Sequence, residues 1–342
     1  MQNFSQNIKI LIIATRYLTP KKIFNYIKLT ISHYIQIILP VKTRTDKSNF
    51  MPYFISVETS NYCNLQCPEC PVGINYKHRI KKNTFNFDSY KKLIDEQKST
   101  LFHVILYFQG EPFLHPKLTE MIDYAHKSKI YTSTSTNGQF LTEKITKEIV
   151  LSKLDKIIVS IDGSTQEIYE TYRVGGSLQK AITGIENIVK WKKELRSITP
   201  FIEIQFLVLS TNEHQMSEMK YLAKKLNVNR LTFKTAQLSN FENGNILLPT
   251  NDKYSRYKLL KDGKYHIKSN LSNHCWRMWS GAVINCNGDV LPCCFDKSSE
   301  HSFGNINNDS LSNNWNNKKA SYFRGKILQN RKQFDICRNC TE

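Results

Sequence analysis

The rest of the chain can be interpreted from one stretch, Cys63-Asn64-Leu65-Gln66-Cys67-Pro68-Glu69-Cys70. Its three thiols follow the apolar run Phe54-Ile55-Ser56-Val57. A structural zinc ion needs four protein ligands, and no fourth ligand follows nearby. A four-iron cubane held by three thiolates instead leaves one iron free for an exogenous ligand. The spacing favours an iron–sulfur site, and zinc stays the open alternative.

Length, charge and cysteine content narrow the class of protein. At 342 residues the chain can form one large domain with an appendage, or two domains. With 48 Lys and Arg against 29 Asp and Glu, the net charge is +19, which suits an anionic membrane, an acidic substrate or a solvated lysine-rich surface. Nucleic acid is disfavoured because no Arg-rich stretch is interleaved with aromatic residues. Nine cysteines, with no secretory signal and no membrane-spanning run, predict a cytoplasmic protein whose thiols serve as ligands.

Residues 1–50 are predicted to form a basic helical leader. From Pro20 onward, an amphipathic helix is expected. Its polar face carries Lys21, Asn25, Lys28, Ser32 and Gln36, and its apolar face carries Ile23, Ile27, Ile31, Tyr34 and Ile38. The apolar face either packs on the protein's own body or makes a peripheral contact with the inner face of an anionic membrane. Both alternatives stay open. Residues 43–48 are predicted to be a polar linker.

Residues 51–245 alternate strands with helices, and residues 246–342 are predicted to form a smaller second domain. Repeated β-then-α units indicate an α/β fold with a parallel sheet and right-handed crossovers. Six units are too few for a closed eight-fold barrel. The expected strands are 53–59, 102–108, 130–135, 156–161, 201–209 and 230–235, and the expected helices are 86–98, 117–128, 142–153, 178–195 and 213–226.

A glycine and polar side chains follow the predicted strands. In parallel barrels the chemistry lies at the C-terminal strand ends, and a glycine lets backbone approach a ligand closely. The cysteine loop follows the first strand. The other strand ends expected to line the site are Gly110-Glu111-Pro112, Thr136-Asn137-Gly138 and Ser160-Ile161-Asp162-Gly163.

The cysteine spacing and these strand ends together resemble the radical S-adenosylmethionine (SAM) enzymes. The resemblance implies a partial (β/α)6 TIM-like barrel and a [4Fe–4S] cluster on Cys63, Cys67 and Cys70, whose free iron binds SAM for cleavage to a 5′-deoxyadenosyl radical. It implies that Gly110, Glu111 and Pro112 meet the SAM amino group. It also implies that Thr136, Asn137, Ser160 and Asp162 line the ribose and methionine end, and that Arg173 pairs with the carboxylate. Glu69 departs from the family, which has an aromatic residue there near the adenine; Tyr107, or Leu207 and Leu209, would have to replace it.

A second cysteine set occupies the C-terminal third. Asn287-Gly288 is a strong hairpin signal between the apolar runs 282–284 and 290–291, and a hairpin can bring distant thiols to one metal. From the residues alone, zinc and iron–sulfur are equally compatible. The pattern C-x12-G-x4-C with a later C-x2-C resembles the SPASM or "twitch" auxiliary-cluster domain. This resemblance implies a small C-terminal α+β domain with one auxiliary [4Fe–4S] cluster held by Cys275, Cys293, Cys337 and Cys340. Cys286 and Cys294 are expected to be packing thiols.

The expected function is that of a radical SAM oxidoreductase. The spacing of the last four cluster thiols is similar to that of a family member that oxidises an aminocyclitol hydroxyl, so the expected substrate is a sugar or cyclitol alcohol. Lys234 and His115 are the candidate bases, and the resemblance implies an electron donor such as a flavodoxin or ferredoxin. The alternative is a peptide- or protein-modifying maturase. A more distant alternative is a non-catalytic zinc module that grips nucleic acid through phosphates.

Overall fold

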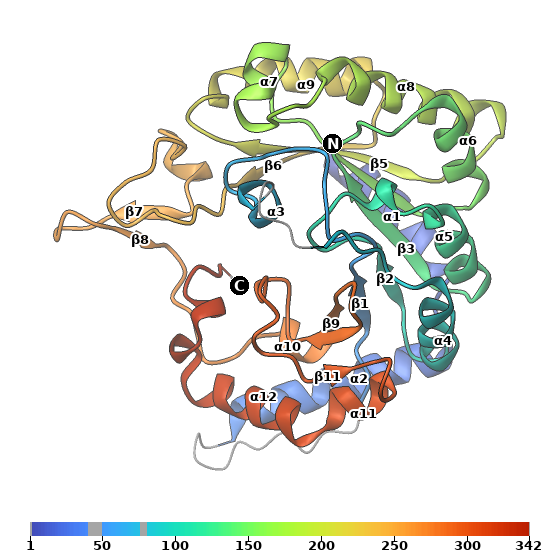
Figure 1. Ribbon diagram of the computed structural model, residues 1–342, viewed down its shortest axis with the longest axis vertical. Coiled ribbons are helices and arrows are strands. Elements are labelled where there is room, and N and C mark those ends of the chain that lie inside the picture. Colours follow the sequence, from blue (N-terminus) through green and yellow to red (C-terminus); the bar gives the residue numbers. More distant parts are fainter. Residues whose placement is uncertain (1, 40–49, 76–80, 342) are drawn as a thin grey trace.

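A computed structural model describes residues 2–39, 50–75 and 81–341 of the protein. Its centre is one curved sheet in the order β11-β10-β9-β1-β2-β3-β4-β5-β6, with helices on its outer face (Figure 1). Neighbouring strands from β1 to β6 are all parallel. The six strands are β1 Phe54–Val57, β2 His103–Ile105, β3 Tyr131–Thr136, β4 Lys156–Ser160, β5 Phe201–Val208 and β6 Arg230–Thr235. The predicted partial (β/α)6 barrel is confirmed.

The barrel forms because apolar side chains from strands and helices meet between two layers. In β4, Ile157 and Val159 are fully buried on the helix-facing side, as the two-residue period of a strand requires. Side-chain caps begin several helices: Asn86 accepts a hydrogen bond from the Ser89 N–H, and Thr142 accepts one from the Ile145 N–H. The covering helices are α4 Phe87–Gln97, α5 Leu118–Lys127, α6 Glu143–Leu151, α7 Gln166–Tyr172, α8 Leu178–Glu194 and α9 Met216–Lys225.

The C-terminal segment joins the same sheet. The predicted hairpin is confirmed as β9 Gly281–Ile284 and β10 Asp289–Leu291, with Gly288 at φ 90° in the turn. β9 pairs in parallel with β1, a long-range pairing that the sequence did not reveal. The sheet therefore continues across the predicted boundary at 245/246. The remaining elements are β7 Tyr257–Leu259, β8 Tyr265–Ile267, α10 Arg277–Ser280, β11 Gly304–Asn305, α11 Leu311–Asn316 and α12 Lys318–Asn330.

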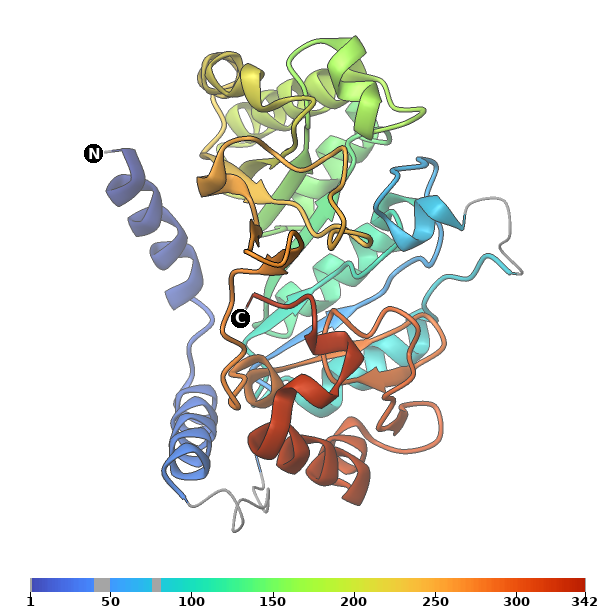
Figure 2. The ribbon, with the colours of Figure 1, turned by 90° about the vertical axis from the view of Figure 1, so that its left-hand side faces the viewer.

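The leader forms two helices, α1 Gln2–Thr15 and α2 Pro20–Ile38, which follow one side of the molecule end to end (Figure 2). Ile13 of α1 and Tyr17, just after the helix, pack near the N-terminal ends of the barrel strands, where they share a cluster with Tyr131 and Phe201. The predicted linker at 43–48 lies outside the described residues. Within the described ranges, no helix is long and apolar enough to cross a membrane.

The apolar face of α2 does not pack on the protein's own body, so that alternative is wrong. The buried residues of α2 are mostly polar (Lys22, Asn25, Leu29, His33 and Gln36). Asn25 explains this orientation, because its amide exchanges two hydrogen bonds with the backbone of Met51, at 3.0 and 3.2 Å. Lys22 donates from Nζ to the carbonyl of Lys129. The polar side of the helix is thus the side that the body holds.

Candidate active site

The cysteine loop lies between β1 and the short helix α3 Pro71–Ile74. Cys63, Cys67 and Cys70 all belong to one apolar cluster with Leu65 and Tyr172. The Cys70 N–H donates to the Cys67 carbonyl at 3.1 Å, which folds the loop back on itself. Burial raises the pKa of Cys63 to about 11. Burial alone therefore disfavours the thiolate at neutral pH, and a bound metal would have to displace the proton.

Gly110 brings the end of β2 against the cysteine loop. A Cβ atom at this position would lie 2.1 Å from the carbonyl oxygen of Ser60 and 2.6 Å from that of Tyr62. The next residue, Glu111, donates its N–H to the Tyr62 carbonyl at 2.9 Å. The glycine therefore permits a close approach between two protein segments. Pro112 follows at the start of a single 3₁₀ turn.

The carboxylate of Glu111 connects the ends of β2 and β3. One oxygen accepts from Thr136 Oγ1 at 2.7 Å and from the Phe113 N–H at 3.1 Å, and the other accepts from the Asn137 N–H at 2.9 Å. Burial raises the pKa of Glu111 to about 7, although these three hydrogen bonds favour the ionised form. Glu111 thus organises neighbouring strand ends, and its expected contact with SAM remains a proposal.

Asn137 extends this connection to the cysteine loop. Its Nδ2 donates to Asn64 Oδ1 at 2.9 Å and lies 3.5 Å from the Sγ of Cys63. Its Oδ1 accepts from the Gln139 N–H at 3.0 Å. An amide donor beside a proposed cluster thiolate stabilises negative charge on the sulfur. Thr136 thus contacts Glu111 and Asn137 contacts the cysteine loop, and their expected place along SAM remains a proposal.

Asp162 and Arg173 form a buried ion pair on the other side of the loop. The Asp162 side chain is fully buried and accepts from Arg173 Nε at 2.6 Å and from the Leu207 N–H at 2.6 Å. Arg173 Nη1 lies 3.8 Å from the Sγ of Cys67. Burial works against the charge of Arg173, but Asp162 and Cys67 raise its pKa, so the guanidinium stays charged. Ser160, also predicted for the site, is buried at the end of β4.

Glu69, the departure from the family pattern, connects the cysteine loop to the segment after β6. Its carboxylate accepts from the Ser239 N–H at 2.7 Å and from Asn245 Nδ2 at 3.1 Å. Of the proposed replacements near the adenine, Leu207 packs against the apolar cluster of the cysteines, whereas Tyr107 lies in a separate cavity described below. Leu209, the other proposed replacement, is a buried member of the same cluster, and which residue packs on the adenine remains a proposal.

The four thiols predicted to hold the auxiliary cluster line one cavity beneath α12. Cys275, Cys293, Cys337 and Cys340 come from three segments of the C-terminal third and meet there. Arg331 lines the same cavity, and its Nη2 lies 3.1 Å from the Sγ of Cys340. Sequence reasoning missed Arg331, because no local pattern relates it to the cysteines.

Each thiol set brings together the type of ligand that an iron–sulfur cluster takes. Among the described residues, no three His, Cys, Asp or Glu side chains converge on one point as a single metal ion would require. A cubane binds each thiolate through a different iron, so its ligands need to surround a volume and do not need to meet at one atom. The charged donors Arg173 and Arg331, each next to one set, suit the excess negative charge of a thiolate-bound cluster.

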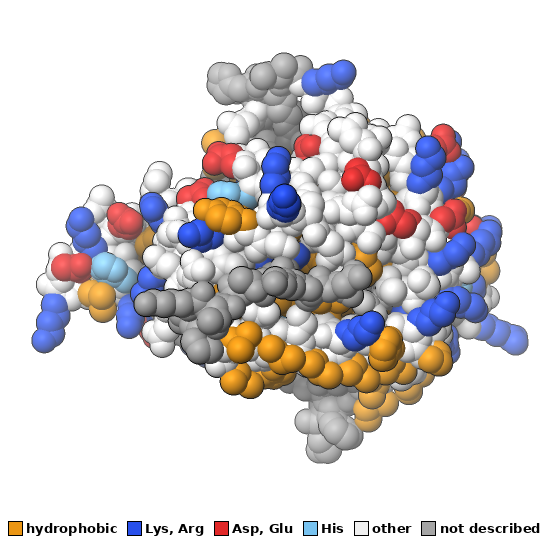
Figure 3. Space-filling view, turned by 90° about the horizontal axis from the view of Figure 1, so that it is seen from below, with side chains coloured by type: hydrophobic (Ala, Val, Ile, Leu, Met, Phe, Trp, Pro, Cys, Tyr) orange, Lys and Arg blue, Asp and Glu red, His pale blue; other side chains and the backbone are white. Residues whose placement is uncertain are grey.

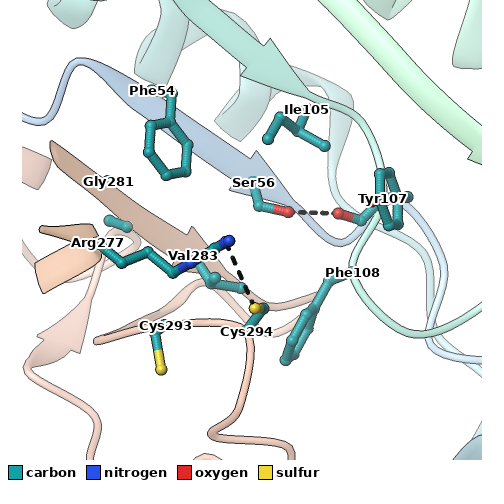
Figure 4. Close-up of a pocket in the computed structure, with 11 residues that line it drawn as sticks. Phe54, Ser56, Ile105, Tyr107, Phe108, Arg277, Gly281, Val283, Cys293 and Cys294 are labelled. Atoms are coloured by element: carbon teal, nitrogen blue, oxygen red, sulfur yellow. Dashed lines mark hydrogen bonds between the residues drawn. The ribbon is translucent and has the colours of Figure 1, made fainter. Parts of the chain in front are cut away.

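A further cavity of about 80 Å³ lies between the barrel wall and the auxiliary thiols (Figure 4). Residues of β1, β2 and β9 line it, together with Tyr107, Phe108 and the thiols Cys293 and Cys294. Arg277 Nη1 lies 3.6 Å from the Sγ of Cys294. Most of the lining is apolar. Cys294 therefore faces a cavity, whereas Cys286, the other leftover thiol, is buried with its Sγ 3.1 Å from the carbonyl of Glu58.

The two candidate bases differ in position. His115 is buried, and both ring nitrogens are engaged: Nε2 with the Phe85 carbonyl at 2.9 Å and Nδ1 with the Lys117 N–H at 3.0 Å. The imidazole has no nitrogen left for a substrate proton, so we do not propose His115 as the base. Lys234 is exposed and lies opposite Leu207 in the β5–β6 register, on the face of the sheet that carries the cysteine loop.

Comparisons with known protein families match the barrel segment and the C-terminal cysteine segment. Residues 57–199 match the family described as the radical SAM superfamily, and residues 275–341 match the SPASM iron–sulfur cluster-binding domain. A partial barrel with one thiol triad and a second thiol set defines an iron–sulfur enzyme. The chain belongs to the radical SAM superfamily and carries a C-terminal SPASM domain. Its cofactors are SAM, a SAM-binding [4Fe–4S] cluster and an auxiliary cluster.

Two curated relatives illustrate the range of the similarity. The chain is 23% identical over 318 residues to the tungsten-containing aldehyde ferredoxin oxidoreductase cofactor-modifying protein of Pyrococcus furiosus, covering 84% of this chain and 87% of that protein. It is 24% identical over 271 residues to the PqqA peptide cyclase of Bradyrhizobium diazoefficiens, covering 74% of this chain and 69% of that protein.

Solved structures share the fold. BtrN in complex with AdoMet and 2-DOIA gives a TM-score of 0.52 at 20% identity, covering 86% of this chain and 94% of that chain. Streptococcus suis SuiB bound to the precursor peptide SuiA gives 0.62 at 15% identity, covering 85% of this chain and 70% of that chain. At these identities the similarity establishes the architecture only.

Proposed function

We propose that this radical SAM enzyme oxidises a side chain of a peptide or protein, in place of the sugar or cyclitol alcohol that the cysteine spacing suggested. The observation that carries the proposal is the apolar cavity beside Cys293 and Cys294 (Figure 4). A cyclitol carries a hydroxyl or amine on most of its carbons, and each would need a hydrogen-bonding partner when buried. Aromatic and aliphatic side chains dominate this lining, which suits an apolar side chain.

Two further observations support a peptide substrate. The relative from Bradyrhizobium is named as a peptide cyclase. The chain also carries a net charge of +19, which would attract an acidic peptide segment.

When bound, the cluster on Cys63, Cys67 and Cys70 with SAM supplies the radical that removes a hydrogen atom, and the auxiliary cluster supplies an acceptor for one further electron. A proton leaves with that electron, so the substrate undergoes a two-electron oxidation. Asn137 and Arg173 orient the first thiol set and stabilise its charge. Lys234, exposed on the same face of the sheet as Leu207, is the proposed acceptor of that proton. A flavodoxin or ferredoxin is the proposed source of the electron that cleaves SAM.

The test separates radical chemistry from substrate choice. Anaerobically reconstituted protein, SAM and dithionite should yield 5′-deoxyadenosine, and the variant with Cys63→Ala, Cys67→Ala and Cys70→Ala should yield none. A panel of acidic peptides with single aromatic or aliphatic residues is then compared with a panel of sugars and cyclitols. A peptide that loses the mass of two hydrogen atoms, in step with 5′-deoxyadenosine, is the expected outcome. Oxidation of a cyclitol with no change in any peptide would refute the substrate proposal.

Cys294 offers a matched pair of variants for the cavity. Cys294→Phe fills the space, so it should abolish substrate oxidation while 5′-deoxyadenosine still forms in the absence of substrate. Cys294→Ser keeps the volume and should retain oxidation. Equal substrate oxidation by both variants would show that this cavity does not hold the reacting group.

A further inference from the structure

The outer surface of the leader helices is the most apolar exposed surface of the described chain. Twelve of its 23 exposed large hydrophobic side chains lie between residues 8 and 38. Figure 3 shows hydrophobic side chains gathered in a band along one edge of the molecule. The most exposed positions on α2 include Phe24 at 59%, Ile31 at 53% and Ile38 at 81%. A monomer rarely exposes a contiguous apolar patch of this kind unless it binds something.

The outward direction of this face is fixed by the body of the protein. Asn25, Lys22 and His33 lie on the opposite side of α2, where Asn25 bonds to the backbone of Met51 and His33 packs against Trp276 and Trp279. At about 100° per residue, the apolar residues of the other side then point away from the body, whereas Leu29 lies on the inner side. The outward residues are Ile23, Phe24, Ile27, Ile31, Tyr34, Ile35 and Ile38. The helix is amphipathic with its polar side inward, the reverse of a helix that covers a core.

Charge identifies the kind of partner. No Asp or Glu occurs among the first 45 residues, which carry seven Lys and Arg. Of these, Lys9, Lys21 and Lys28 are exposed on the described helices, and Arg16 is exposed in the turn between them. On α2, Lys21 and Lys28 fall at one flank of the apolar stripe, where a long side chain can place its ammonium group beside lipid phosphates. A second copy of the chain would instead bring like charges together with no acidic residue of the leader to offset them.

We propose that the outer face of α1 and α2 binds the surface of an anionic lipid bilayer. The apolar side chains enter the interface between headgroups and acyl chains, and the flanking basic residues contact anionic headgroups. The helices lie along the surface of the bilayer and do not cross it.

The position of the leader determines how the enzyme sits on the bilayer. The inner side of α1 packs against Tyr131 and Phe201, the first residues of β3 and β5. It therefore lies at the N-terminal ends of the barrel strands, whereas the cysteine loop and the other site residues follow the C-terminal ends. Lipid binding leaves the open end of the barrel facing solution, accessible to a peptide and to an electron donor.

The experiment is co-sedimentation of the full-length protein with vesicles of phosphatidylcholine alone or with about one quarter phosphatidylglycerol. Wild type should pellet with the anionic vesicles and lose binding as salt increases. The double variant Ile27→Glu/Ile31→Glu should lower the partition coefficient about tenfold or more, because two inserted side chains become charged. The matched control Ile198→Glu/Ile246→Glu makes the same change at two exposed positions outside the leader, and it should bind as wild type does.

Both double variants should keep the wild-type circular dichroism spectrum and the basal rate of 5′-deoxyadenosine formation, since neither touches the site. Failure of wild type to bind either vesicle, or equal binding by the leader variant, overturns the proposal. Sedimentation velocity provides a further arm: a dimer that Ile27→Glu/Ile31→Glu abolishes, without vesicle binding, would identify the face as a self-association surface. These outcomes do not depend on the substrate of the enzyme.

Discussion

Replacing Asp162 by Asn tests whether the ion pair beside the cysteine loop holds the site together. Asp162 is fully buried and makes two hydrogen bonds of 2.6 Å, to Arg173 and to the Leu207 N–H. The Asn oxygen can still accept from Leu207, so the change mainly removes the negative charge. It leaves the largely buried Arg173 without its partner. Breaking a buried pair in this way costs about 3 kcal/mol.

The assay is urea unfolding of wild type and variant at equal cluster content, followed by circular dichroism, with the free energy of unfolding obtained by linear extrapolation. Asp123→Asn is the matched control, because Asp123 pairs with Lys127 at the same 2.6 Å but on the surface. Its expected effect is about 0.5 kcal/mol or less. Arg173→Met and the double variant Asp162→Asn/Arg173→Met complete a cycle. Their coupling energy should exceed about 2 kcal/mol.

If Asp162→Asn lowers the free energy of unfolding by less than about 1 kcal/mol, the ion pair does not hold the site together. The same follows if the effects of Asp162→Asn and Arg173→Met simply add in the double variant. A large loss of stability in Asp162→Asn should be accompanied by weaker SAM binding, because Arg173 also lies 3.8 Å from the Sγ of Cys67. SAM affinity of the loaded enzyme, measured by equilibrium dialysis, checks that second consequence.

Three further changes test other parts of the site. Burial raises the pKa of Glu111 from its ordinary 4.5 to about 7, so the stability tied to its proton is present below pH 4.5 and is lost as pH rises through about 7. Glu111→Gln should flatten that decline in urea midpoints measured from about pH 5 to pH 8, and an unchanged slope would exclude Glu111 as its source. Cys293→Ser should lower bound iron by roughly the content of one cluster, whereas Cys286→Ser should leave iron unchanged; equal losses in an iron assay would count against the assigned ligand set. Glu69→Ala removes two hydrogen bonds to the segment after β6, so proteolysis near Ser239 should become faster while iron content is kept. An unaltered digestion pattern would show that this connection does not order the segment.

Local patterns in the sequence predicted the fold because they act over short distances. Strand and helix periods repeat within a few residues, so the alternation that produces β1 to β6 can be read without tertiary information. The thiol triad spans eight residues, and its spacing favoured a cluster with a free position, with zinc left as the alternative. The strand-end residues followed from one rule, that parallel strands end on the same edge of a barrel.

Contacts between segments far apart in the sequence determined the features that local patterns could not predict. Glu69 bonds to residues 170 and 176 positions later, and β9 pairs with β1 although no local signal links them. Arg331 reaches the auxiliary thiols in the same way.

The leader shows most clearly why some features depend on the tertiary structure. Its period determined that α2 has a polar and an apolar face, but a period cannot say which face meets the body. The Asn25 amide and the Met51 backbone decided that, because a buried polar group must find its hydrogen-bond partners, and only the folded chain supplies them.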